Sequence, residues 1–213
     1  MPMIDRPLPS VTFQRDLFGA EAPSCDPTLA GLRRTDLGAG AWIDHLREWV
    51  RGSDVLLEAL WTSMRWHAQR RRMYDRVVDV PRLVATWPDD GPGHPLIPWM
   101  AAALSARYGR PLPGVGLAAY RNGRDSVALH GDRLGPARDD AIVAIVALGA
   151  RRRFLLRPVE GGPSRALDFG GGDLLVMGGT CQRTWEHGVP KSAHGDLRIS
   201  VQFRSAPVEP SPA

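Results

Sequence analysis

Long apolar runs, paired cysteines and lysine are all scarce in this sequence of 213 residues. The longest apolar stretch, AIVAIVALGA at 141–150, is far too short to span a bilayer. The N-terminus MPMIDRPLPS has no apolar signal-peptide core. We therefore expect a cytoplasmic protein with no membrane partner. The two cysteines, Cys25 and Cys181, form no CxxC pair, which argues against a disulfide framework and against a cysteine-ligated zinc site.

Because Lys191 is the only lysine, nearly all of the positive charge in this chain of net charge +4 is arginine. Arginine holds phosphate through two parallel hydrogen bonds, so a nucleic-acid partner is compatible with the composition. A GC-rich genome also enriches arginine, and composition does not separate the two causes. The run MRWHAQRRRMYDR at 64–76 contains Arg70, Arg71 and Arg72 with interleaved aromatic residues. It predicts phosphate contacts; a solvated face of a strand or hairpin is the alternative.

The length and a hydrophobic content of 43% are typical of one soluble globular domain, and nothing in the pattern suggests more than a monomer. Residues 1–36 are rich in Pro, Asp, Gly and Ser and have no sustained period, which predicts an extended N-terminal arm. Residues 37–204 are expected to form a single domain. Residues 205–213, SAPVEPSPA, are expected to be a disordered tail.

The expected domain has two parts that differ in their predicted secondary structure. Apolar residues at helical spacing predict helices at 41–50, 53–64 and 97–108. From about residue 115, short strand-like runs alternate with Gly, Pro and Asp turns. These eight runs are 116–121, 126–130, 141–148, 152–158, 165–169, 173–177, 183–187 and 197–204. Eight short strands at this spacing favour an α+β fold in which N-terminal helices support a β-sandwich or jelly roll.

A possible metal site begins in the stretch DSVALHGDRLG at 125–135, where His130 precedes Asp132 by two residues. Side chains two apart on a strand leave the same face, so both can reach one metal ion. His187 ends another expected strand and is the candidate third ligand. Two imidazoles and one carboxylate form the facial triad of non-haem Fe(II), which leaves three positions open. Polar residues at a turn are the alternative explanation of H-x-D alone.

The last expected strand carries two arginines on one face. Arg198, Ser200, Gln202 and Arg204 alternate with the apolar residues of the same run. Arginines on an inner strand face are costly to bury unless they are paired. If the metal binds a 2-oxo acid, the acid's distal carboxylate and an iron-ligating Asp132 would pair them. A solvated face remains the alternative for this strand by itself.

Four stretches together resemble the AlkB family of Fe(II)- and 2-oxoglutarate-dependent nucleic-acid dealkylases. They are YRNGRDSVALHGD at 120–132, VALGARRRFLLR at 146–157, GGDLLVMGGTCQRTWEHGVP at 171–190 and RISVQFR at 198–204. The resemblance extends over about residues 80–204. It implies a double-stranded β-helix, or jelly roll, at about 115–204, preceded by a lid or substrate-recognition region at about 64–98.

The resemblance also implies an activity. An enzyme of this family uses Fe(II), 2-oxoglutarate and O2 to oxidise the alkyl carbon on a base nitrogen, which releases an aldehyde and the repaired base. His130, Asp132 and His187 would bind the iron. The expected partner is alkylated DNA, with RNA left open as a second substrate.

For the co-substrate, the resemblance implies that Arg198 holds the distal carboxylate of 2-oxoglutarate and that Tyr120 hydrogen-bonds to it. Arg204 would lie near the 1-carboxylate and Asp132. Ser200 stands where many members have Asn, so a weaker contact is expected there.

Three departures from the family pattern concern the binding of the co-substrate and the choice of substrate. Ala118 stands where members commonly have an Asn that helps to hold 2-oxoglutarate, and Leu134 stands where relatives often have an acid. The lid segment PDDGPGHPLIP at 88–98 is short and rich in Pro and Gly. A short lid predicts an open pocket that accepts etheno adducts as well as methyl groups.

A base must leave the duplex to reach a buried iron, and it then needs a stacking surface. Trp87, at the lid edge, is the first candidate, with core packing as the alternative. Arg82 is a further substrate-binding candidate, together with the arginines of the 64–76 run. Two other functions stay open: an oxygenase acting on a protein or small molecule, and a non-catalytic nucleic-acid-binding sandwich that contains a metal.

Overall fold

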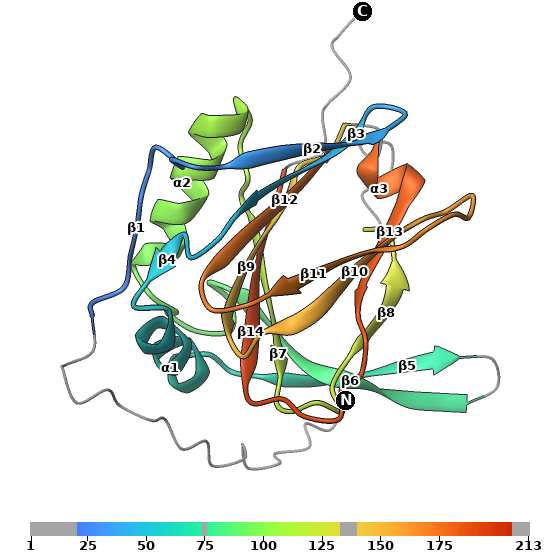
Figure 1. Ribbon diagram of the computed structural model, residues 1–213. Helices are drawn as coiled ribbons and strands as arrows, with labels where there is room; N and C mark the ends of the chain where they lie inside the picture. Colours follow the sequence, from blue (N-terminus) through green and yellow to red (C-terminus); the bar gives the residue numbers. More distant parts are fainter. Residues whose placement is uncertain (1–20, 74–75, 133–139, 206–213) are drawn as a thin grey trace, which may run out of the picture.

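The computed structural model describes residues 21–73, 76–132 and 140–205, and these form two facing β-sheets flanked by helices (Figure 1). The larger sheet has the spatial order β2 (Arg33–Gly38), β3 (Ala41–Leu46), β12 (Asp173–Gly179), β9 (Val143–Gly149), β14 (Arg198–Arg204), β7 (Gly114–Tyr120), β6 (Arg76–Trp87), β5 (His67–Met73). The smaller sheet has the order β11 (Arg165–Phe169), β10 (Arg152–Pro158), β13 (Trp185–Val189), β8 (Val127–His130). A short pair joins β1 (Ser24–Cys25) to β4 (Val50–Arg51).

The paired strands described in both sheets run antiparallel, and β9, β14 and β12 lie opposite β10 and β13. This arrangement is a jelly roll, so the α+β fold class expected from the sequence is confirmed. Each of the eight expected strand ranges overlaps a strand. The helix α3 (Cys181–Thr184) takes the first two residues of the range 183–187.

Two helices cover the outer face of the larger sheet (Figure 1). They are α1 (Ser53–Ser63) and α2 (Leu96–Tyr108), close to the predicted ranges 53–64 and 97–108. Leu60 of α1 and Leu104 of α2 are fully buried in the same cluster as Ile199 of β14. Leucine burial at this spacing contributes roughly 2 kcal/mol per side chain and fixes the helices on the sheet.

A second core lies between the two sheets and surrounds the candidate site. Ile145 of β9, Phe154 and Leu156 of β10 and Phe169 of β11 belong to it. Strand β9 is buried from Val143 to Leu148 because the helical layer covers one face and the smaller sheet the other. This double coverage explains why its sequence is a continuous apolar run and not an alternating one.

The helix expected at 41–50 is wrong, because Ala41–Leu46 is strand β3. Gly38, Ala39 and Gly40 all have positive φ and turn the chain from β2 back into β3. Trp42 then lies over Gly178 of β12, where its indole leaves no room for a side chain. The apolar spacing fitted a helix equally well, and the pairing with β12 decides for the strand.

The described part of the expected arm contains two strands. β2 begins at Arg33, before the expected domain boundary at residue 37, and forms the edge of the larger sheet. The rest of the arm, residues 1–20, and the expected tail from 206 onward lie outside the described residues. Among the described residues, no helix is both long enough and apolar enough to cross a membrane.

Candidate metal centre

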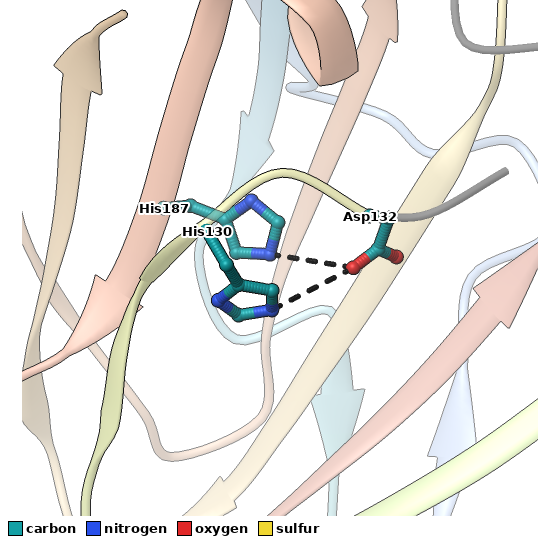
Figure 2. A group of neighbouring side chains, drawn as sticks. All are labelled: His130, Asp132 and His187. Carbon is teal, nitrogen blue, oxygen red and sulfur yellow. Dashed lines mark ion pairs between the residues drawn. The ribbon is translucent and has the colours of Figure 1, made fainter. Parts of the chain in front are cut away.

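Two neighbouring strands of the smaller sheet bring His130, Asp132 and His187 together (Figure 2). His130 is the last residue of β8 and pairs in register with His187 of β13. Asp132 follows on the loop that leaves β8 and turns its carboxylate toward both rings. One potential ligand atom from each residue lies within 4.8 Å of the others. The three residues singled out in the sequence therefore form one cluster.

The cluster is closed on one side and open on the other. Nε2 of His130 lies 3.7 Å from Oδ1 of Asp132, and Nε2 of His187 lies 3.9 Å from the same oxygen. His187 and Asp132 are buried, whereas the side chain of His130 is 39% exposed. Nδ1 of His130 is 2.8 Å from the carbonyl oxygen of Ala128, which leaves Nε2 facing the cluster. A ligand can thus approach from the His130 side.

The protonation states suit a divalent cation. Burial, with His130 adding to it, lowers the pKa of His187 to about 3, so its ring is neutral near pH 7. Burial is the largest single influence on Asp132 and by itself would raise its pKa, but the charge and hydrogen bond of Arg204 act together with His187 and His130, and the net pKa is lowered. Metal ligands must be neutral imidazole and ionised carboxylate. This donor set fits Fe(II), which binds two histidines and one carboxylate with positions left open.

The cavity next to the cluster has walls from both sheets. The residues that line it are Arg82, Tyr120, Val127, His130, Asp132, Val143, Ile145, Phe154, His187, Val189, Ser200, Gln202 and Arg204. Phe154 stacks on His187 with ring centroids 5.7 Å apart. The sequence analysis missed Phe154, although its alternation with two exposed arginines on β10 was a signal that it faces inward.

Arg198 lies next to Ser200 and Tyr120, two residues that line this cavity. It is completely buried, its Nη1 donates to Oγ of Ser200 over 2.7 Å, and its Nε and Nη2 have no hydrogen-bond partner in the part of the chain that the structure describes. Its guanidinium lies 5.2 Å from the ring centre of Tyr120. Burial lowers the pKa of Arg198 to about 10, which still leaves it charged. An unpaired buried cation is costly, so the residues present fit a ligand that brings a carboxylate.

Of the two residues of β6 predicted to bind substrate, one lies at the cavity and the other does not. Arg82 lines the cavity, and its buried Nε has no hydrogen-bond partner among the described residues. Trp87 is not brought to the cavity: it packs against the helix-side core and donates Nε1 to the carbonyl of Pro92 over 3.0 Å. The physical reason is strand alternation, since an odd number of positions separates the two residues on β6. Trp87 therefore has the position expected of a core-packing residue, the alternative to base stacking that the sequence left open.

The basic run forms a hairpin of β5 and β6 at the end of the larger sheet. Arg70, Arg71 and Arg72 pair through their backbones with Asp79, Val78 and Val77. Their side chains lie outside the described residues, as does Leu134, so their predicted contacts stay predictions. Ala118 pairs with Ser200, and its side chain lies in the core between the sheets.

Comparison with known proteins assigns the family. The 2OG-Fe(II) oxygenase superfamily matches over residues 62–204. The human alpha-ketoglutarate-dependent dioxygenase alkB homolog 3 is 28% identical over 218 residues, covering 92% of this chain and 73% of that protein. The AlkB resemblance stated from the sequence is thereby confirmed.

Two solved structures share the fold. A prolyl hydroxylase from Trichoplax adhaerens, in complex with a hypoxia inducible factor peptide fragment, has a TM-score of 0.58 at 12% identity, over 78% of this chain and 83% of that one. OsALKBH1 has a TM-score of 0.52 at 16% identity, over 80% of this chain and all of that one. The chain belongs to the 2OG-Fe(II) oxygenase superfamily and is a dioxygenase that uses Fe(II), 2-oxoglutarate and O2.

Proposed function

We propose that this dioxygenase oxidatively removes alkyl groups from damaged nucleobases, N-alkyl or etheno adducts, in DNA, and that RNA is a second substrate to be tested. The observation that carries the proposal is the similarity to alkB homolog 3 over 92% of the chain. The reaction oxidises the alkyl carbon on a base nitrogen, releasing an aldehyde, succinate and CO2. A basic chain whose charge is nearly all arginine is compatible with such a partner.

In this proposal His130, Asp132 and His187 hold the iron. Their donor set and their shared open side support the assignment. When bound, the iron and its co-substrate supply the oxidation of a C–H bond. The chain's own part is to bind and orient the reactants, and the core between the two sheets closes the buried side of the cluster.

Arg198 holds the distal carboxylate of 2-oxoglutarate in this proposal. Its unpaired Nε and Nη2 provide two donors, while Ser200 orients the guanidinium through Nη1. Tyr120 lines the same cavity and contributes its hydroxyl. Arg204 donates a hydrogen bond to Asp132 and would lie near the 1-carboxylate of bound 2-oxoglutarate. The Arg198 assignment pairs a guanidinium that is completely buried in the structure.

On the substrate side, Arg82 is the described residue best placed to contact a base. It lines the cavity and its Nε lacks a partner. Arg70, Arg71 and Arg72 stand on the β5–β6 hairpin that continues from Arg82 along β6, so a strand bound at the cavity would run along this hairpin. Phosphate contacts there would position the strand without reading its sequence.

The test is release of succinate and aldehyde from oligonucleotides that carry 1-methyladenine, 3-methylcytosine or ethenoadenine, as DNA and as RNA. The proposal expects product only with a lesion, and none from the His187→Ala variant. Succinate release that is independent of any lesion would refute nucleobase dealkylation and point to a protein or small-molecule substrate. Activity that survives His187→Ala would refute the proposed ligand set.

A further inference from the structure

The short helix α3 precedes the strand that carries one candidate iron ligand and contacts the loop that carries another. Its four residues, Cys181–Thr184, lie directly before β13, which bears His187. Figure 1 shows α3 at one end of the β-sandwich, next to the end of β13. Its N-terminal side is anchored to the larger sheet, because Oγ1 of Thr180 donates to the carbonyl of Ala39 over 2.7 Å. This helix is therefore held in place independently of the metal cluster.

Gln182 extends from α3 to the loop that carries Asp132. Its Oε1 accepts the backbone N–H of Asp132 over 2.9 Å. Both residues are buried, with Gln182 only 1% exposed. The backbones of the loop and of α3 are also in close contact, since a Cβ at Gly131 would lie 2.6 Å from the carbonyl oxygen of Gln182. The loop between the two ligands His130 and Asp132 is thus seated directly on α3.

The orientation of the Gln182 amide is determined by its surroundings. Its Nε2 lies 3.8 Å from Sδ of Met177, a weak acceptor, and Oε1 faces the Asp132 amide, which can only donate. The opposite orientation would set two donors against each other. Asp132 is consequently held at two points: Gln182 fixes its backbone, and Arg204 fixes its carboxylate over 2.7 Å.

We propose that Gln182 is a positioning residue that sets the metal affinity of the site. It acts through the Asp132 backbone and keeps the carboxylate in register with His187, because α3 and β13 are contiguous. The inference rests on His130, Asp132 and His187 being the ligands, as proposed above. Residues that orient metal ligands commonly change metal affinity about 10- to 100-fold when they are removed.

The experiment compares metal binding with fold stability in four variants. Gln182→Met keeps the size but removes the acceptor for the Asp132 amide, and Gln182→Glu restores an acceptor oxygen. Thr184→Ala is the matched control, because it loses a hydrogen bond within α3 to the carbonyl of Thr180. Asp132→Ala tests the ligand set itself. The readouts are the Kd for Mn(II), as a redox-stable substitute for Fe(II), by calorimetry and the melting temperature of chelator-treated protein.

The inference expects Gln182→Met to weaken Mn(II) binding roughly tenfold or more, Gln182→Glu to recover most of it, and Thr184→Ala to match wild type. Equal Mn(II) affinity in wild type and Gln182→Met would overturn the positioning role, as would a loss that Thr184→Ala reproduces. If Gln182→Met does not fold, the role is judged from Gln182→Glu against Thr184→Ala, and a Gln182→Glu affinity below that of the control overturns it. Unchanged affinity in Asp132→Ala would refute the ligand set, a result separate from the other outcomes.

Discussion

Arg204 donates its Nε hydrogen to Oδ2 of Asp132 over 2.7 Å, although 72 positions separate the two residues. An arginine at the end of β14 thereby neutralises the carboxylate on the loop that follows β8. Burial acts to raise the pKa of the Asp132 carboxyl, and Arg204, together with His187 and His130, lowers it by more, so that the net pKa is lowered. A buried carboxylate that stays ionised without a metal is ready to bind one.

Removing the Arg204 charge is expected to weaken metal binding. In Arg204→Met, burial would act on Asp132 without its opposing cation, so the carboxylate would bind a proton in competition with the metal. We expect the Kd for Mn(II) to rise roughly tenfold or more, with a larger loss at acidic pH. The control is Arg157→Met, whose partner Glu186 lies at the surface. A pH profile of Kd identical to wild type would contradict the prediction.

Replacing Arg198 by Met is expected to weaken the binding of 2-oxoglutarate without lowering the melting temperature. Two nitrogens of the buried guanidinium have no partner among the residues described, so the apolar variant should melt at the same or a higher temperature without 2-oxoglutarate. Its affinity for 2-oxoglutarate should fall about tenfold to a hundredfold, the value of a lost charge-assisted hydrogen bond pair. Calorimetry on Mn(II)-loaded protein measures it, with the exposed Arg153→Met as control. Wild-type affinity in Arg198→Met would refute its role.

Ser200→Ala is expected to have a smaller effect of the same kind. Ser200 accepts one hydrogen bond from Nη1 of Arg198. Loss of this hydrogen bond leaves the charge of Arg198 in place but no longer fixes the orientation of its guanidinium. We expect the KM for 2-oxoglutarate to rise a few-fold, by about 1 kcal/mol of binding free energy, while kcat changes less. A fall in kcat with an unchanged KM would contradict this orienting role.

Arg82 and Trp87 are expected to give opposite phenotypes, because they lie on opposite faces of β6. Arg82→Met should raise the KM for an alkylated oligonucleotide and leave the melting temperature nearly unchanged, since Arg82 lines the cavity. Trp87→Ala should lower the free energy of unfolding by roughly 1–3 kcal/mol through lost packing. Base stacking by Trp87 would be supported, against this prediction, if Trp87→Phe raised the same KM without loss of stability.

His45 is expected to make the fold less stable in mild acid. Burial is the main cause that lowers the pKa of this imidazole, and its buried Nε2 has no partner among the described residues. The unfolded chain binds the proton at about pH 6.5, above the folded pKa, so stability falls as pH drops below that value. His45→Phe should reduce the difference in melting temperature between about pH 7.5 and about pH 5.5. The exposed His194→Ala is the control, and an undiminished difference in His45→Phe would contradict the assignment.

The sequence by itself determined the jelly-roll half and the inner face of its last strand. Alternation places Arg198, Ser200 and Arg204 on one face wherever the strand lies, because successive side chains leave opposite faces. The two-residue spacing of His130 and Asp132 predicted a common direction, and the two side chains do meet, although Asp132 lies on the loop after β8. These are local consequences of backbone geometry, so they could be read before any tertiary contact was known.

Only the tertiary structure decided which residues meet. The segment 41–46 fits a helix by its apolar spacing, and it is a strand because β12 offers Gly178 beneath Trp42. Trp87 turns away from the cavity because of its register on β6. Gln182 reaches the Asp132 backbone 50 positions away. Pairing and burial energies act between distant segments, and no local pattern in the chain encodes which neighbour a side chain will find.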